Sequence, residues 1–198
     1  RVINALMSFA RRRRVVLVRG NHDPDDSLLA GWGVEMVDEM VVPAGRKKYL
    51  VCHGHLWDKS MGLPHWLING ADTVYHFAQR IDPTHRLARG LKRGCKHFCR
   101  SIAALQRRAV LAARERGLDG VILGHTHMAR NTRQDGVHYL NSGCWTETPS
   151  AFVGIRRGQV RRYYWESVVR RAARAGAVPD TRVLPLYPAL TFQTQEAA

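Results

Sequence analysis

The sequence predicts an α/β fold, and three features lead to that prediction. Short apolar segments with the length of strands alternate with longer stretches of helical periodicity. Three of the β-rich segments end in a glycine beside polar side chains, as strands do where they open onto the functional edge of a sheet. The chain has 198 residues, 45% of them hydrophobic, which suits one domain with a proper core.

The first part of the chain predicts a helix followed by short strands. Apolar residues from Val2 to Phe9 recur near one helical face, and four arginines separate them from the first strand. Asp25-Asp26-Ser27 is a helix-start signal for a short helix that ends at Gly31 or Gly33. The strands expected in this part lie at 14–19, 34–37, 40–42 and 48–52.

The second part predicts a long helical region and then β-hairpins. Helical patterns fill 57–117, and a clear amphipathic helix ends at Gly117. Its apolar positions are Phe98, Ile102, Leu105, Ala109 and Ala112. A buried strand is expected at 120–123, hairpins over 129–165 with a turn at Asp135-Gly136, and a short basic helix at 166–176.

The charge of the chain indicates the chemistry of its partners. A formal net charge of +15 favours phosphate-bearing partners, namely nucleotides, nucleic acid or an anionic lipid surface. The four cysteines lack a C-x-x-C spacing, which is typical of reduced thiols in the cytoplasm. The sequence contains no run of 18 or more apolar residues, so it predicts no transmembrane helix. The first residues already have the pattern of a helix interior, so we expect a longer natural protein.

The three polar clusters are Gly20-Asn21-His22-Asp23, His53-Gly54-His55 and Gly124-His125-Thr126-His127. If their strands lie side by side, the clusters gather at one edge of a sheet. Alternate side chains of an extended segment point the same way, so His125 and His127 should converge. Imidazoles and an amide oxygen are ligands for a divalent transition metal.

Each cluster alone also has a plain structural interpretation. Glycine and asparagine dominate turns, so the first cluster by itself is typical of a turn. A single histidine such as His53 is more often a satisfied, partly buried side chain than a ligand. The succession of three clusters at three strand ends favours a metal site instead.

These clusters, in this order, resemble the later motifs of the calcineurin-like metallophosphoesterases. Segments 49–54, 120–127 and 139–147 are similar to the UDP-2,3-diacylglucosamine pyrophosphohydrolase branch, and the resemblance covers residues 1–165. It implies a β-sandwich flanked by helices, with a helical lid insertion at 57–117 and the first strands missing. Residues 166–198 would form a basic helix and an irregular tail outside this domain.

The resemblance also implies a centre of two divalent metal ions. Mn²⁺ is our first expectation because mixed nitrogen and oxygen ligation suits it, with Fe or Zn as alternatives. The implied ligands are Asn21, His53 and His125 for one ion and His127 for the other. His22 would stabilise charge on the phosphoryl group or protonate the leaving oxygen, and Asp23 would orient His22.

Two features depart from the family pattern. Position 55 holds His where many enzymes of that branch have Asp. The Asp-x-His and Gly-Asp motifs that open the family pattern, and that supply further metal ligands, do not occur before the first cluster. We therefore expect little catalysis and weak metal binding from this stretch alone.

The helical insertion carries information about the substrate. From residue 80 to residue 116, eleven Lys or Arg residues stand against Asp82 and Glu115. This run is either a solvated helix surface or a basic lid for an amphiphilic phosphorylated substrate. In the second case, Lys92, Arg93 and Lys96 are the substrate-binding candidates.

The sequence thus predicts a hydrolase that cleaves the pyrophosphate of a UDP-diacylglucosamine-type lipid precursor. We expect it in the cytoplasm and at the anionic inner face of the membrane. One alternative is a soluble phosphodiesterase or protein phosphatase of the same superfamily. A nucleic-acid-binding module would explain the charge, but no helix-turn-helix, zinc-finger or RNP signature accompanies it.

Overall fold

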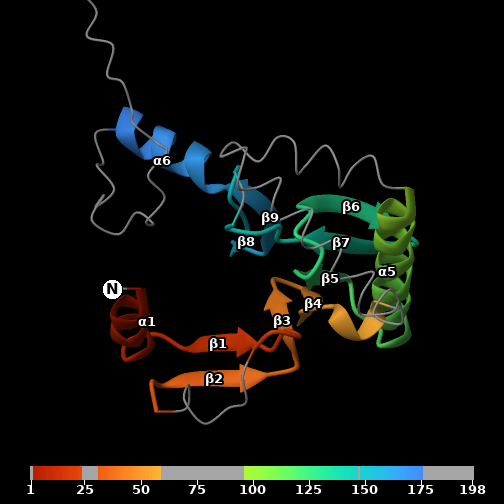
Figure 1. Ribbon diagram of the computed structural model, residues 1–198, viewed down its shortest axis with the longest axis horizontal. Coiled ribbons are helices and arrows are strands. Elements are labelled where there is room, and N and C mark those ends of the chain that lie inside the picture. The colour runs from red at the N-terminus through yellow and green to blue at the C-terminus, as the bar shows by residue number, and fades with distance from the viewer. Residues whose placement is uncertain (1, 24–30, 59–95, 147, 176–198) are drawn as a thin grey trace, which may run out of the picture.

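The computed structural model describes residues 2–23, 31–58, 96–146 and 148–175. These residues form three β-sheets flanked by helices, which confirms the predicted α/β class (Figure 1). The short helix expected at 27–30, the larger part of the insertion at 59–95 and the tail from 176 lie outside the described residues. The expected domain boundary at residue 165 stays a prediction.

The largest sheet has five strands in the order β3-β4-β5-β7-β6. The strands are β3 (Glu39–Ala44), β4 (Lys47–Cys52), β5 (Gly120–Leu123), β7 (Val137–Asn141) and β6 (Arg130–Gln134). The three central strands run parallel, and an antiparallel strand pairs with each outer side. The carboxyl ends of β4, β5 and β7 therefore meet at one edge, the usual place for ligands in α/β proteins.

Helix α5 (Lys96–Glu115) covers one face of this sheet. Leu105 and Ala109 on its apolar stripe are buried against sheet residues that include Val121. The predicted spacing is right at these two positions, but Ala112 is only half-buried, and Ala113 fills the core in its place. The helix ends as expected, because Gly117 follows it with a φ of 64°, a left-handed conformation that favours glycine.

The hairpin of β8 (Ala151–Arg156) and β9 (Gln159–Tyr164) belongs to the opposite side of the sheet. Val160 of this hairpin packs with Ile122 and Leu140, so the five-stranded sheet lies between α5 and the hairpin. Helix α6 (Trp165–Arg174) follows at the position of the expected basic helix and buries no residue. No helix in the described part of the chain is long and apolar enough to cross a bilayer.

Helix α1 (Val2–Ala10) leads into a separate two-stranded parallel sheet. Its strands are β1 (Val15–Val18) and β2 (Val34–Val37). The expectation that all three polar clusters follow neighbouring strands is wrong for β1. Both sides of β4 are already occupied, by β3 and by β5, so β1 cannot join that sheet next to it.

Candidate metal centre at the edge of the sheet

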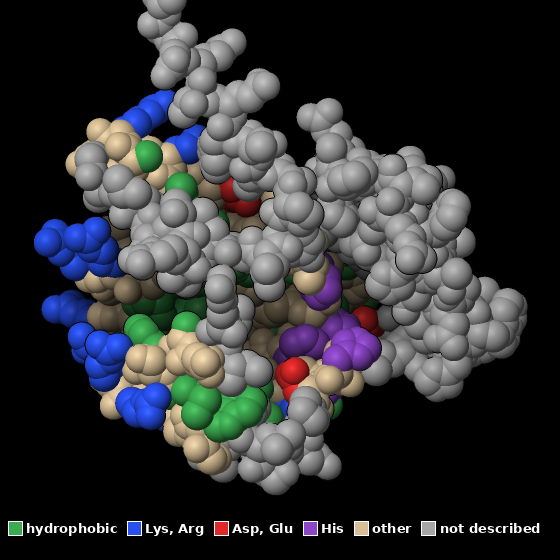
Figure 2. All heavy atoms as spheres, turned by 60° about the vertical axis from the view of Figure 1, so that its left-hand side comes forward, with side chains coloured by type: hydrophobic (Ala, Val, Ile, Leu, Met, Phe, Trp, Pro, Cys, Tyr) green, Lys and Arg blue, Asp and Glu red, His purple; other side chains and the backbone are tan. Residues whose placement is uncertain are grey.

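The three polar clusters meet although their strands belong to two sheets. The rings of His53, after β4, and His125, after β5, have centroids 5.0 Å apart. Gly20, after β1, lies so close that a methyl group on its α-carbon would be 3.0 Å from His53 Nε2. Figure 2 shows histidine side chains gathered beside acidic ones on one face of the molecule. Contact between the ends of separate sheets therefore builds this corner.

The loop after β5 has a backbone that the sequence argument did not anticipate. His125 and His127 have φ values of 58° and 57°, so both are left-handed rather than extended. The expectation that they converge as alternate residues of an extended segment is therefore wrong. The chain must turn sharply at this point, and Thr126 N–H donates to the Gly124 carbonyl across 2.7 Å. Such conformations cost about 1–3 kcal/mol per residue and cluster at functional sites.

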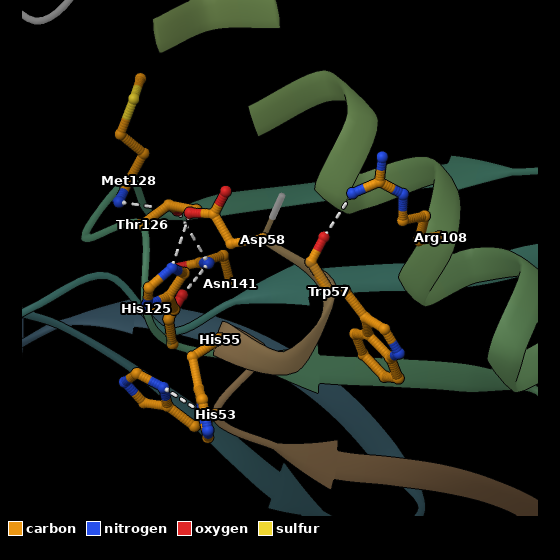
Figure 3. Close-up of polar contacts among 10 residues, drawn as sticks. His53, His55, Trp57, Asp58, Arg108, His125, Thr126, Met128 and Asn141 are labelled. Atoms are coloured by element: carbon orange, nitrogen blue, oxygen red, sulfur yellow. Dashed lines mark hydrogen bonds and ion pairs between the residues drawn. The ribbon is translucent and has the colours of Figure 1, made fainter. Parts of the chain in front are cut away.

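Asn141 at the end of β7 holds this strained loop in place. It is fully buried, and its Nδ2 donates to the Gly124 carbonyl and to Thr126 Oγ1 (Figure 3). Its Oδ1 accepts a hydrogen bond of 2.9 Å from the Gly143 N–H. A buried amide with both ends engaged is costly to disturb, so the fold itself maintains the left-handed histidines. The sequence argument did not identify Asn141 as a site residue, although it is the polar last residue of an apolar strand.

His53 is a neutral imidazole at the centre of the cluster. Burial, followed by the nearby His125 and His55 rings, lowers the pKa of His53 to about 4, while Asp23 acts in the opposite direction. An unprotonated ring nitrogen is what a metal ligand requires. Near neutral pH the fold therefore keeps His53 in a form able to bind a cation.

His55 is linked directly to His53. Their Nδ1 atoms are 3.2 Å apart, so one ring donates to the other and His53 turns its Nε2 toward Gly20. The short helix η1 (His55–Trp57) begins after Gly54, whose φ of 101° permits the tight turn between the two histidines. His55 thus contacts His53, the predicted ligand.

Asp58 is a site residue that the sequence argument missed. Its Oδ2 lies 2.8 Å from His125 Nε2, and the two side chains are only 16% and 14% exposed (Figure 3). Asp58 N–H donates to the His55 carbonyl, and Arg108 of α5 donates to the Trp57 carbonyl across 2.6 Å. An acid three residues after His55 was visible in the sequence, but its partner is 67 residues away.

The turn after β1 brings its predicted residues to the same corner. Asn21, His22 and Asp23 are all exposed there. The Asp23 carboxylate accepts a hydrogen bond of 2.7 Å from the Gly20 N–H, which closes the turn against His53. The ligand role of Asn21, the catalytic role of His22 and the orienting role of Asp23 remain predictions.

The remaining predicted residues differ in how far the structure describes them. His127 is exposed at the end of the strained loop, and it contributes to the lowered pKa of His53. Lys92 and Arg93 lie outside the described residues, and the side chain of Lys96, at the start of α5, does as well. Their assignment to substrate binding is therefore untested.

The donor atoms of this corner fit a divalent transition metal in their chemistry. His53 is neutral, His125 lies beside it, and the turn with Asn21 touches the ring of His53. Across the described ranges, however, no three His, Cys, Asp or Glu side chains form a group able to hold a metal ion. The rings are engaged with each other and with Asp58, so metal binding requires these hydrogen bonds to rearrange or further ligands to join.

Comparison with solved structures gives remote neighbours. One is an archaeal phosphodiesterase, 15% identical, with a TM-score of 0.43 over 82% of this chain and 74% of the neighbour. Another is vacuolar protein sorting 29 from Cryptosporidium parvum, 17% identical, with a TM-score of 0.40 over 82% and 73%. Vps29 from Entamoeba histolytica, complexed with Zn²⁺, is 15% identical, with a TM-score of 0.37 over 77% and 68%.

A search of curated proteins found no match. The comparison with protein families gives a clear result. The family model of the calcineurin-like phosphoesterase superfamily domain matches residues 1–155, which is most of the chain and includes all three polar clusters. The chain therefore belongs to the calcineurin-like phosphoesterase superfamily.

Proposed function

We propose that this protein is a metal-dependent hydrolase of phosphoric anhydrides or esters. Membership of the superfamily suggests a hydrolase that acts on phosphoesters with the help of divalent metal ions. The observation that carries the proposal is the pairing of neutral His53 with His125, which a strained loop holds 5.0 Å away at the end of two parallel strands. Non-glycine residues held in a left-handed conformation cluster at binding and active sites, which supports a ligand-binding role for this loop.

The residues of this corner would act by binding and orienting. Asn21, His53 and His125 would hold one ion and His127 would contribute to a second, with Mn²⁺ the first expectation. When bound, such ions neutralise phosphate charge and make water nucleophilic near neutral pH. His22, which is exposed on the turn after β1, would donate a proton or a hydrogen bond to a phosphate oxygen.

The substrate we propose is the pyrophosphate group of a UDP-diacylglucosamine-type lipid precursor. The resemblance of segments 49–54, 120–127 and 139–147 to that branch supports it, and so does the basic character of the insertion. The described part of the insertion contributes to the site, because its Asp58 carboxylate lies 2.8 Å from His125 Nε2. Such an enzyme would work at the anionic inner face of the membrane.

The test is hydrolysis of a UDP-diacylglucosamine substrate by the purified protein, with Mn²⁺ present. Release of UMP is expected, and release of inorganic phosphate alone would contradict the proposed substrate. Turnover of water-soluble phosphodiesters but not of the lipid would favour the alternative, a soluble phosphodiesterase. Without added metal, activity should disappear.

Loss of a residue that only hydrogen-bonds to a metal ligand typically lowers metal affinity by about 10–100-fold. His125→Ala removes a proposed ligand itself, so it should lower Mn²⁺ affinity by more than that. His138→Ala is the matched control, since His138 lies at the other end of the same strands and should leave metal affinity unchanged. Equal loss of affinity in the two variants would contradict the placement of the metal.

A further inference from the structure

Asp58 Oδ2 and His125 Nε2 lie at a hydrogen-bond distance of 2.8 Å inside the candidate metal centre. Neither side chain is more than 16% exposed, so the contact is largely shielded from water. Solvent and salt therefore screen the contact little, so a hydrogen bond of fixed geometry here can orient the imidazole ring. The pair is therefore a candidate for a specific task rather than a casual surface contact.

Both partners are held in place independently of the contact between them. Asp58 follows η1, its N–H is bonded to the His55 carbonyl, and the carbonyl of the preceding Trp57 is bonded to Arg108. His125 stands in the loop that Asn141 braces from β7. Three elements that are distant in sequence thus bring one carboxylate oxygen to one ring nitrogen.

We infer that Asp58 is a positioning residue that fixes the tautomer of His125. A carboxylate oxygen only accepts hydrogen bonds, so the nitrogen that faces it, Nε2, must carry the proton. In the neutral ring the other nitrogen, Nδ1, is then unprotonated and available as a ligand. Metal-binding histidines commonly donate their second ring N–H to a carboxylate in this way, which fixes the ring and increases its basicity.

The effect of Asp58 on metal binding rests on the proposed function. The tautomer of His125 can be observed whether or not a metal binds. This tautomer assigns His125 to the metal through Nδ1, whereas His53, whose Nδ1 faces His55, has Nε2 turned toward Gly20. The two histidines would thus present different nitrogen atoms. The sequence alone gives no basis for this distinction, because Asp58 is paired with His125 only in the folded chain.

The first test needs no variant and no metal. A long-range ¹H–¹⁵N spectrum of the metal-free protein at neutral pH should show His125 protonated on Nε2 and unprotonated on Nδ1. In Asp58→Ala the two tautomers should be mixed, and in Asp58→Asn the Nε2–H form should persist, because the amide oxygen can still accept. A proton on Nδ1 in the wild-type protein would overturn the inference, as would an unchanged spectrum in Asp58→Ala.

The second test measures Mn²⁺ binding by isothermal titration calorimetry. Asp58→Ala should lower the affinity by about 10–100-fold, and Asp58→Asn should lower it less. Asp135→Asn is the control, since it removes one carboxylate from the exposed β6–β7 turn, at the end of β7 opposite the candidate site, where asparagine also tolerates the φ of 50°. Wild-type affinity in Asp58→Ala would overturn the functional part of the inference.

The two measurements distinguish failure of the inference from failure of the proposed function. If the phosphoesterase assay fails but His125 has the expected tautomer and Asp58→Ala weakens Mn²⁺ binding, the positioning role stands without the proposed substrate. If hydrolysis occurs while the spectrum and the affinity of Asp58→Ala match the wild type, the hydrolase stands and Asp58 has no positioning role.

Discussion

A single histidine, His138, and the histidine cluster of the candidate site lie at opposite ends of the parallel strands, and they differ in how their polar atoms are satisfied. His138 pairs with Gly120 at the start of β5, whereas His125 follows the end of that strand. His138 Nδ1 is 3.0 Å from the Tyr49 hydroxyl, and its Nε2 is 2.7 Å from Asn131 Oδ1. Both ring nitrogens of His138 are engaged within a regular strand.

The cluster at the candidate site has a different character. His125 and His127 have left-handed backbones, and His53 makes its hydrogen bond to another imidazole. The comparison teaches that burial and a lowered pKa do not by themselves indicate function, because His138 also has a pKa below its ordinary value through burial and the nearby Arg133 and Lys47. Backbone strain and imidazoles that face each other distinguish the candidate site.

The largest expected change in stability is that of a substitution at Gly120, which pairs with His138. A methyl group at this position would be 2.7 Å from the His138 carbonyl oxygen and would collide with the Tyr49 ring. Because a backbone atom in a sheet cannot move aside, Gly120→Ala should lower the free energy of unfolding by about 3 kcal/mol or more. Urea denaturation measures the change.

Gly124→Ala serves as the control for that experiment. The nearest atoms to a methyl group there are 3.8 Å away, so the stability should change by less than about 1 kcal/mol. If both variants were equally stable, the packing around His138 would be more adaptable than its contacts imply.

An intermediate effect is expected from pH in the metal-free protein. The pKa of His53 is about 4 in the folded state and 6.5 in the unfolded state, so below 6.5 the unfolded chain takes up the proton first. Stability is therefore fully present above pH 6.5 and is lost as the pH falls toward 4. His138 also makes the folded state less stable as the pH falls, because its pKa is lowered as well.

Urea denaturation of the metal-free wild type and of His53→Asn, each at pH 7 and pH 5, measures how much of the pH-dependent loss of stability is due to His53. The variant should lose less stability between the two values, since one of the groups that resist protonation is gone. An identical loss in both proteins would show that His53 titrates in the folded state as it does in the unfolded chain.

The smallest effect is expected at His127, whose exposed side chain has a left-handed backbone with φ 57°. His127→Gly should be more stable than His127→Ala by about 0.5–1 kcal/mol, because glycine relieves the strain. At His138, inside a regular strand, the order should reverse. Thermal unfolding of the four variants checks both orders, and a more stable alanine variant at position 127 would contradict the strain argument.

The sequence by itself located the main helices and strands and the three polar clusters. Apolar spacing located α5, strand-length runs located β4 and β5, and a pair of turn residues, Asp135 and Gly136, located the hairpin of β6 and β7. These features are local: periodicity and turn preference depend on neighbours a few residues apart. The three histidine-bearing clusters were recognisable for the same reason, since each is contiguous.

The tertiary structure alone decided how the clusters meet. It placed β1 in a second sheet, gave the loop after β5 its left-handed histidines, and paired Asp58 with His125 across 67 positions. Asn141 was equally inaccessible to local reasoning, because its role depends on the register of β7 against β5. Such contacts arise from packing between distant segments, where no short-range preference operates, so only the folded chain specifies them.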